Sequence, residues 1–308
     1  MKSKLYKKKI ILLIGGPTAS GKSKLAIDIA KEINGEIINA DSMQVYKNFP
    51  ILTSQPTIKE KKNVNHHLYG YYNTNKSYNG SIWLKDSYFF VKKSFSLGKI
   101  PIVVGGTGLY LEFLSKGISK IPEISEKTKK IINDLLLKDG LKNLYKNLVK
   151  VDPEYAEKIS CNDKKRIMRA LEVFYETKRN ISFYHKKTST NKNFDFYKIF
   201  LSPPKEEIAK NCTERFDKMI SNGLLEEFEK NQKYVKNCNI SNAIGFKELK
   251  DYFTYESSLS KLADKIILNT KKYAKRQFTW FNKRYSPQIK VSSHKKKSLI
   301  LESLFKII

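Results

Sequence analysis

The chain has 308 residues, of which 40% are hydrophobic, 12% aromatic and 29% charged, so it can bury a sizeable core over about two average domains. This composition excludes a disordered, a collagen-like and a disulfide-scaffold protein. Residues 10–14 form the longest aliphatic run, far short of the roughly 18 residues of a membrane span. Lysines 7–9 before that run imitate a signal peptide, but the run is too short and no small-residue cleavage site follows. The three cysteines, Cys161, Cys212 and Cys238, are too widely spaced for a disulfide framework or a zinc site, and we expect a cytosolic protein.

The net charge is the most prominent compositional feature, since 59 Lys and Arg stand against 30 Asp and Glu, giving +29. Such a charge favours a polyanionic partner, nucleic acid before membrane, because no basic amphipathic anchor helix is evident. Only six of the basic residues are Arg, so a drift in codon usage toward Lys is the alternative explanation. The uneven distribution argues for function, because residues 265–297 hold eleven Lys and Arg and no Asp or Glu.

Strand and helix patterns alternate in the first 110 residues. Residues 10–15 are apolar and rich in β-branched side chains, which predicts a buried parallel strand, and a helical pattern over residues 22–33 follows. Residues 36–40 predict a second strand, residues 83–97 a helix, and residues 101–104 a third buried strand. This alternation is typical of an α/β fold, a parallel sheet flanked by helices.

The pattern changes near Pro122. Between residues 125 and 179 only helical patterns occur, broken at Gly140 and Pro153. Strand character returns at residues 196–201, and helices follow to about residue 282. We therefore expect an all-helical domain, residues 121–196, inserted into a core of residues 1–120 and 197–290. Residues 291–308 are poor in core pattern and predict a basic C-terminal tail.

A phosphate-binding loop joins the first predicted strand to the first helix. Residues 16–23 match G-x-x-x-x-G-K-[ST] in the strand–helix context that this motif requires. Backbone N–H groups and the helix N-terminus favour phosphate there, Lys22 neutralises its terminal oxygens, and Ser23 offers a hydroxyl to Mg²⁺. The predicted diphosphate-binding residues are Gly16, Pro17, Thr18, Ala19, Ser20, Gly21, Lys22 and Ser23. The motif indicates a diphosphate or triphosphate, without specifying a nucleotide.

Two further segments fall at the predicted carboxyl edge of the sheet. Asp41 follows the second strand, where a carboxylate can accept a proton from a substrate or help to hold Mg²⁺ through water. A plain turn is the alternative there. Residues 105–108 read Gly-Gly-Thr-Gly, small residues that would let a substrate approach, and Thr107 could hydrogen-bond it. His66 and His67 lack a third metal-like partner, so we interpret them as structural residues in a loop.

Taken together, these motifs resemble the tRNA dimethylallyltransferase (tRNA isopentenyltransferase) family over nearly the whole chain. The matching segments are residues 16–23, 41–46 (Asp-Ser-Met-Gln-Val-Tyr), 66–68, 104–110, 162–172, 214–216, 245–246 and 274–280. Each segment alone is weak, but their order and spacing are specific. The chain departs from the family pattern at Lys271, where Arg is usual, and at residues 51–56, Ile-Leu-Thr-Ser-Gln-Pro in place of Ile-Gly-Thr-Ala-Lys-Pro.

The resemblance implies a P-loop-type core with a helical insertion that grips the anticodon stem-loop of tRNA. It also implies transfer of a dimethylallyl group from dimethylallyl diphosphate to N6 of adenine 37, next to the anticodon. Asp41 would then take the amine proton, while Lys22, Thr18, Arg215 and Mg²⁺ on Ser23 stabilise the leaving diphosphate. The reacting base must be extruded from the stacked loop. We expect the chain to act as a monomer, away from membranes.

The tRNA contacts that the resemblance implies come from the acceptor pocket, the helical insertion and the C-terminal half. They are Asp41, Ser42, Met43, Gln44, Thr107, Lys129, Lys165, Arg166, Ile167, Met168, Arg169, Asn242, Ala243, Ile244, Gly245, Phe246, Lys247, Lys275, Arg276, Gln277 and Trp280. Basic residues would contact phosphates, and aromatic residues would stack on bases.

A P-loop kinase of small molecules or nucleosides is the main alternative function. In such a kinase Asp41 would take a hydroxyl proton, and Arg166 and Arg169 would form a lid over ATP. The basic C-terminal third argues against it, because a kinase of small molecules needs no polyanion groove. A non-enzymatic RNA-binding module would leave the intact phosphate loop unexplained.

Overall fold

The computed structural model describes residues 9–187, 193–235, 238–255 and 258–307. The chain divides into two compact units, a core unit of Met1–Ser115 and Lys192–Ile308 and a helical unit of Lys116–Asn191. The division falls five residues before each boundary expected from the sequence. Within the described ranges, none of the helices combines the length and hydropathy that crossing a membrane requires.

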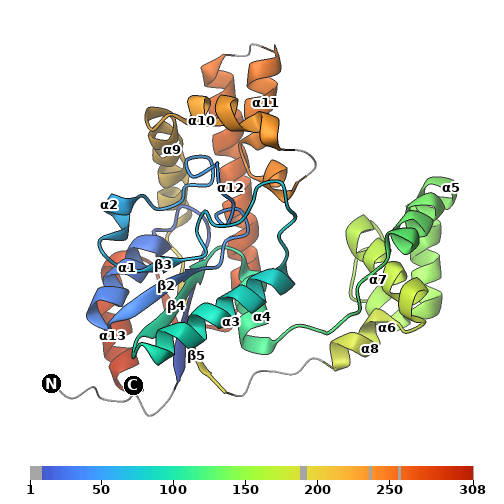
Figure 1. Cartoon of the computed structure of the whole chain (residues 1–308), viewed down its shortest axis with the longest axis horizontal. Helices are drawn as coiled ribbons and strands as arrows, with labels where there is room; N and C mark the ends of the chain where they lie inside the picture. The colour runs from blue at the N-terminus through green and yellow to red at the C-terminus, as the bar shows by residue number, and fades with distance from the viewer. Residues whose placement is uncertain (1–8, 188–192, 236–237, 256–257, 308) are drawn as a thin grey trace. The chain divides into compact units, whose positions relative to one another are not determined.

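The core unit is built on a six-stranded parallel sheet in the order β3-β2-β4-β1-β5-β6 (Figure 1). The strands are β1 (Ile10–Gly15), β2 (Gly35–Asn39), β3 (His66–His67), β4 (Ile100–Gly105), β5 (Asp195–Leu201) and β6 (Ile289–Val291). Gly15 lies opposite Gly105, and Asn39 opposite Val104, so β1, β2 and β4 end at the same edge. The parallel register therefore gathers the phosphate loop, Asp41 and the Gly-Gly-Thr-Gly turn.

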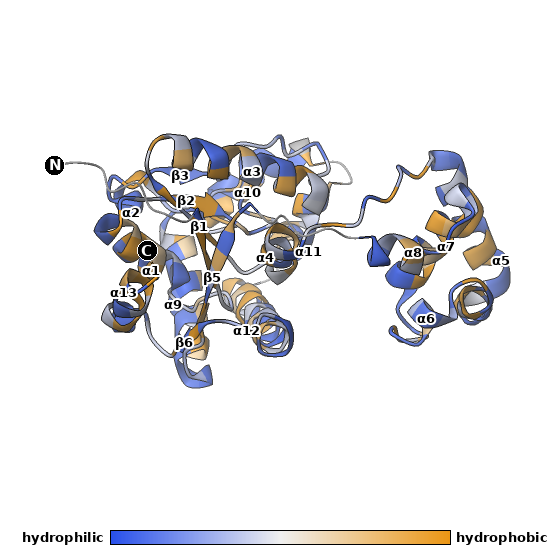
Figure 2. Cartoon of the chain, turned by 90° about the horizontal axis from the view of Figure 1, so that it is seen from below, coloured by the Kyte–Doolittle hydropathy of each residue, from blue (hydrophilic) through white to orange (hydrophobic). Residues whose placement is uncertain are grey.

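Helices cover both faces of this sheet. The core-unit helices are α1 (Lys22–Glu32), α2 (Ile58–Lys61), α3 (Gly80–Ser96), α4 (Gly108–Lys116), α9 (Lys205–Ser221), α10 (Leu224–Asn231), α11 (Phe246–Tyr255), α12 (Leu259–Arg284) and α13 (Lys297–Phe305), with short 3-10 turns at Gln232–Tyr234, Asn239–Asn242 and His294–Lys296. Helices α1 and α13 pack on the face that carries Leu12, Ile102 and Ile199. Helices α3 and α12 contact the other side of the strands. Figure 2 shows hydrophobic residues on the central strands, between these helices.

The helical unit consists of α5 (Glu126–Val151), α6 (Pro153–Ala156), α7 (Lys164–Thr177) and α8 (Ile181–Lys186). Its core includes Leu144 and Leu148, four residues apart on α5, and Leu171 of α7, all of which are buried. The two sequence breaks are confirmed: Gly140 kinks α5 at φ 73°, and α5 ends at Val151, with Asp152 between it and Pro153, which begins α6.

Two expectations about the core unit were wrong. Residues 291–308 are not a tail: β6 pairs with β5, and Ile300 and Leu304 of α13 are fully buried in the core with α1. The segment was missed because β6 is three residues long and α13 is short. The histidines lie in edge strand β3, not in a loop. His67 stacks on Phe90 at 4.4 Å and lies 3.1 Å from Glu36, which supports a structural role.

Glu36 is a buried carboxylate at the start of β2. Burial by itself raises its pKa, but hydrogen bonds from Asn65 (2.7 Å), Lys99 (2.8 Å), His67 (3.1 Å) and Ser94 (3.0 Å) outweigh burial and lower the pKa to about 2. Because the pKa is lower in the folded state than in the unfolded state, Glu36 stabilises the fold above about pH 4.5, and this contribution is lost as the pH falls toward 2.

We expect the stability difference between the wild type and Glu36→Gln to shrink by about 1–2 kcal/mol between pH 6 and pH 3, at about 1.4 kcal/mol per pKa unit. Urea unfolding of both proteins at pH 6 and pH 3 measures this change in the stability difference. A difference that is independent of pH would contradict the assignment, because the titrating group would then lie elsewhere.

Candidate functional site

The phosphate loop curls back at the end of β1 and leads into α1. Ala19 and Gly21 have positive φ (60° and 84°), which turns the backbone sharply before Lys22 begins α1. The Lys22 Nζ atom donates to the Pro17 carbonyl at 2.9 Å, so the side chain folds over the loop. The Ser20 hydroxyl is buried without a hydrogen-bond partner within the described residues. This geometry is that of an anion cradle, with a cation and N–H groups around one space.

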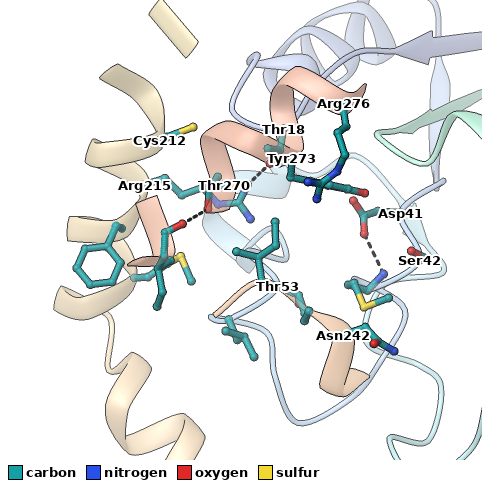
Figure 3. Close-up of a pocket in the computed structure, with 17 residues that line it drawn as sticks. Thr18, Asp41, Ser42, Thr53, Cys212, Arg215, Asn242, Thr270, Tyr273 and Arg276 are labelled. Carbon is teal, nitrogen blue, oxygen red and sulfur yellow. Dashed lines mark hydrogen bonds between the residues drawn. The ribbon is translucent and has the colours of Figure 1, made fainter. Parts of the chain in front are cut away.

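A cavity of about 270 Å³ opens beside this loop (Figure 3). Its lining combines charged and hydroxyl groups with apolar side chains from six separate segments of the core unit. The lining residues are Thr18, Asp41, Ser42, Met43, Leu52, Thr53, Cys212, Arg215, Phe216, Met219, Asn242, Ala243, Ile244, Ile266, Thr270, Tyr273 and Arg276. The cavity therefore brings the predicted diphosphate side and the predicted acceptor side together.

Arg215 connects α9 to the phosphate loop. Its Nη1 atom donates to the Thr18 hydroxyl at 2.5 Å, the bond drawn in Figure 3. One turn earlier on α9, the Asn211 side chain donates to the Ala19 carbonyl at 2.8 Å. Burial lowers the pKa of Arg215, although the nearby Asp41 carboxylate raises it. The guanidinium stays charged at neutral pH, because an arginine pKa is far above 7, and it faces the cavity with the loop.

Hydrogen bonds within the segment at the end of β2 hold the backbone and the side chain of Asp41 in place. Its backbone N–H donates to the Asn39 side chain at 2.9 Å, and its Oδ1 atom accepts from Met43 N–H at 2.9 Å and Gln44 N–H at 3.4 Å. Figure 3 shows the carboxylate facing Tyr273 and Arg276. The turn interpretation and the catalytic one are thus compatible, since one oxygen closes the turn while the carboxylate lines the cavity.

Lys22 is the cation whose pKa changes most in the site. Burial, with a smaller contribution from the Arg215 charge, lowers its pKa to about 8, although the Asp41 carboxylate opposes this shift. Burial also raises the pKa of Tyr273 and Tyr110, and the Asp41 charge adds to both shifts. The negative charge of Asp41 therefore raises the pKa values of Lys22, Arg215 and both tyrosines.

The glycines of the Gly-Gly-Thr-Gly turn after β4 make room for other parts of the protein, whereas the sequence led us to expect room for a substrate. A Cβ at Gly105 would lie 2.1 Å from the Ala40 carbonyl oxygen. A Cβ at Gly106 would lie 2.2 Å from the Gln277 side chain, and one at Gly108 would lie 2.1 Å from the Trp280 ring. These glycines admit the backbone after β2 and the side chains of α12, not a substrate. The Thr107 Oγ1 atom accepts from Ser42 N–H at 3.1 Å, which ties this turn to the segment after Asp41, and the expected hydrogen bond from Thr107 to a substrate stays a prediction.

Apart from Thr107 and Trp280, which lie at the turn after β4, the predicted tRNA contacts separate into three groups. Asp41, Ser42, Met43, Asn242, Ala243, Ile244 and Arg276 line the cavity itself. Lys129, Lys165, Arg166 and Arg169 are exposed on the helical unit, and Lys247 and Lys275 are exposed on the core unit. Three of the four helical-unit cations pair locally, Lys129 with Glu126, Arg166 with Asp163 and Arg169 with Glu172.

A third group of predicted contacts has its side chains turned into the protein. Ile167 is in the core of the helical unit, with Met168 partly buried against that core. Phe246 packs on Phe49 and Phe228, and Gly245 is buried. The Gln44 amide donates to the carbonyls of Thr53 (3.0 Å) and Ser54 (2.8 Å), and Gln277 is bonded at both ends inside the core unit. Apolar burial or internal hydrogen bonds occupy these side chains in the structure, and their contact with RNA stays a prediction.

The sequence reasoning missed several cavity residues on α9 and α12. Cys212, Phe216 and Met219 share the α9 face of Arg215, and Ile266, Thr270 and Tyr273 lie on α12 before Arg276. Steps of three or four residues relate the members of each set (212, 215, 216 and 219; 266, 270, 273 and 276), and this spacing is the signal that could have found them. Lys271, the departure from the family pattern, lines a separate groove with Lys205 and Phe278. Ser23 likewise lines a neighbouring cavity of about 340 Å³, with Asp28 and Glu60.

The comparisons with known proteins agree with this geometry. The family described as IPP transferase matches residues 44–284. The chain is 41% identical over 286 residues to the tRNA dimethylallyltransferase of Pelagibacter ubique, covering 91% of each chain. It is 37% identical over 308 residues to that of Rickettsia conorii, covering 98% of this chain and 85% of the relative. The chain belongs to the IPP transferase family.

Solved structures of this family share the fold. The chain superposes on a eukaryotic dimethylallyltransferase acting on tRNA with a TM-score of 0.78 at 31% identity, covering 89% of this chain and 70% of that one. It superposes on the tRNA isopentenylpyrophosphate transferase of Bacillus halodurans with a TM-score of 0.71 at 29% identity, covering 97% of both chains. The IPP transferase fold accounts for the parallel sheet and its flanking helices.

Proposed function

We propose that this chain transfers a dimethylallyl group from dimethylallyl diphosphate to N6 of adenine 37 in tRNA, giving N6-isopentenyladenosine and diphosphate. The observation that carries the proposal is the single cavity in which Thr18 and Arg215, beside an anion cradle, meet the Asp41 carboxylate and an apolar wall. The names of the relatives and the neighbouring structure that acts on tRNA support it.

On the donor side, the leaving group is a diphosphate on which negative charge grows as the allylic carbon–oxygen bond breaks. Its oxygens would be bound by the Lys22 ammonium, which folds over the phosphate loop, and by the Arg215 guanidinium and the Thr18 hydroxyl, which are bonded to each other. Donors that are fixed in place before the reaction stabilise such developing charge without reorganisation. The apolar wall, which includes Leu52, Phe216 and Met219, fits the five-carbon chain.

On the acceptor side, the exocyclic amine of adenine is a poor nucleophile because its lone pair is delocalised into the ring. As the nitrogen–carbon bond forms, the nitrogen becomes positive and its proton acidic, and Asp41 takes that proton. The carboxylate also faces the cation-like allylic carbon, so its charge favours the transition state over the ground state. The base reaches this cavity after extrusion from the anticodon loop.

Mg²⁺ is the cofactor that we propose for the donor. The described residues contain no cluster of three or more His, Cys, Asp or Glu side chains that could hold a metal ion. We propose that the Ser23 hydroxyl, which is exposed, would hold the ion together with diphosphate oxygens, a common way for proteins to bind Mg²⁺. When bound, Mg²⁺ would neutralise part of the diphosphate charge.

Incubation with radiolabelled dimethylallyl diphosphate or with γ-labelled ATP, each with bulk tRNA, tests the proposal. We expect the prenyl label to move to tRNA, at adenine 37 once the product is digested to nucleosides. Label transfer from ATP alone would favour the kinase, and no transfer with retained tRNA binding would favour an RNA-binding module. We propose a cytoplasmic monomer, since one chain supplies both sides of the cavity, and sedimentation of the active species checks the oligomeric state.

The binding of tRNA should depend strongly on salt. The segment of residues 265–297 holds eleven basic residues and no acidic ones, and Lys272, Lys275 and Lys283 of α12 are exposed. If about six phosphates are neutralised, log Kd against log salt should have a slope magnitude of about 4–6. Replacing these three lysines by Gln should reduce the slope magnitude by about one for each phosphate that is no longer neutralised.

Filter binding between 50 and 300 mM salt measures this slope. The triple variant Lys85→Gln, Lys92→Gln, Lys93→Gln, on exposed positions of α3, is the matched control and should leave the slope nearly unchanged. A wild-type slope magnitude below about 2 would mean that the charge is a drift in codon usage.

Donor affinity should fall at alkaline pH. Because the pKa of Lys22 is about 8 in the free protein, the ammonium is lost as the pH rises through that value. We expect the Kd for dimethylallyl diphosphate without tRNA to rise about tenfold or more between pH 7 and pH 9.5, since a charge-assisted hydrogen bond is worth about 1.5–3 kcal/mol. Lys22→Met should bind weakly with little change over this range, and equal pH dependence in the two proteins would contradict the assignment.

A further inference from the structure

Gln277 of α12 lies between two loops of the site, and both ends of its side-chain amide are bonded. Its Oε1 atom accepts from Thr18 N–H at 2.8 Å, and its Nε2 atom donates to the Gly106 carbonyl at 2.9 Å. The residue is 6% exposed. The glycine at position 106 is what gives the amide room, because a Cβ there would lie 2.2 Å from Nε2.

The two loops belong to opposite sides of the reaction. On the donor side, the Thr18 hydroxyl accepts from Arg215. On the acceptor side, Gly106 precedes Thr107, whose hydroxyl accepts from the backbone N–H of Ser42, the residue after Asp41. A line of hydrogen bonds, joined covalently within Thr18 and between Gly106 and Thr107, thus runs from Arg215 through Gln277 to the segment that carries Asp41. The Thr18 N–H belongs to this line, so other groups of the loop must bind the diphosphate.

We propose that Gln277 is a positioning residue that fixes the donor loop relative to the acceptor turn. This proposal rests on the proposed function, since it assigns the two sides of the cavity to donor and acceptor. An amide side chain meets the requirement because it accepts from an N–H and donates to a carbonyl at once. Glu lacks the donor, and Met, of similar length, lacks both. Misplacing reacting groups by about 1 Å can cost about a hundredfold in rate while leaving each binding site intact.

The test compares Gln277→Met and Gln277→Glu with the matched control Gln288→Met. Gln288 also bridges two backbone groups, accepting from Lys198 N–H and donating to the Phe196 carbonyl, but at the exposed edge near β6. We expect both Gln277 variants to transfer the prenyl group about 10–100-fold more slowly in single turnovers. Their Kd values for dimethylallyl diphosphate alone and for tRNA alone should stay within about threefold of the wild type, and Gln288→Met should match the wild type throughout.

Amide hydrogen exchange supplies a second readout that does not depend on activity. Exchange at Thr18 N–H should accelerate in Gln277→Met and not in Gln288→Met, because only the first change frees that N–H. Gln277→Glu keeps the acceptor for Thr18, so its exchange should stay closer to the wild type while its transfer is slow. Comparing the two variants therefore distinguishes the effect of losing the hydrogen bond from Thr18 from the effect of losing the hydrogen bond to Gly106.

Three results would overturn the proposal. They are single-turnover transfer by both variants within threefold of the wild type, tRNA affinity reduced tenfold with a normal rate at saturating tRNA, or wild-type exchange at Thr18 in Gln277→Met. The second result would instead make Gln277 a direct tRNA contact. A wild type that transfers no prenyl group would overturn the proposed function, whereas an active wild type with unaffected variants overturns only the role of Gln277.

Discussion

Asp41→Asn is expected to fold, to bind tRNA within a few-fold of the wild type, and to transfer the prenyl group at least about a hundredfold more slowly. The amide can still accept from the backbone N–H groups of Met43 and Gln44, so the turn after β2 should survive. It cannot take up the proton that N6 releases, nor offer a negative charge to the allylic cation. Loss of a general base costs about 10²–10⁴ in rate, or roughly 3–5 kcal/mol.

Single-turnover rates with saturating donor at pH 7 isolate this step from product release. Asp217→Asn is the matched control, because Asp217 is exposed on α9, outside the cavity lining. Transfer by Asp41→Asn within about tenfold of the wild type would mean that another group is the base. If the Asn variant does not fold, Asp41→Glu keeps the charge and moves it by one methylene, and it should also slow transfer.

Arg215→Lys should reduce kcat/KM for dimethylallyl diphosphate by about 10²-fold while leaving tRNA affinity nearly unchanged. The guanidinium donates to the Thr18 hydroxyl and has further N–H groups for the diphosphate. A lysine keeps the positive charge but has no planar fork, so it cannot make paired contacts with phosphate oxygens. The change therefore tests geometry at constant charge.

Initial rates at varied donor concentration and separate tRNA titrations measure the two effects. Arg284→Lys is the control, since Arg284 is exposed at the end of α12 and pairs with Glu112 outside the cavity lining. A loss of tRNA binding with normal donor kinetics would move Arg215 to the RNA side. Unchanged kinetics for both substrates would remove it from the site altogether.

The parts of the fold that the sequence predicted were those encoded locally. The apolar run of β1, the glycines and Lys22 of the phosphate loop, and the position of Asp41 after β2 need no distant partner to be recognised. Because parallel strands end at one edge, these three segments also predicted where a site would form. The break at Gly140 followed in the same way from a residue that adopts a positive φ easily.

What could not be predicted depends on tertiary packing. Strands β3 and β6, two and three residues long, exist because the sheet edges offer them backbone partners. The α9 and α12 residues of the cavity, such as Phe216 and Tyr273, are apolar or aromatic positions on long helices. Their spacing shows that they share a helix face, but only the fold shows that this face covers the phosphate loop.

The order of the strands also has a consequence for biosynthesis. Strand β1 is made before both of its partners, β4 and β5, and the helical unit is encoded between those two partners. At a translation rate of about 5–20 residues per second, β1 waits on the order of ten seconds or more for β5 to be made. The helical unit has its own core of local contacts, so it can fold during this delay. During this delay one edge of the apolar strand β1 stays unpaired in the nascent chain. Holdase chaperones could bind that edge until residues 195–201 leave the ribosome and pair with it.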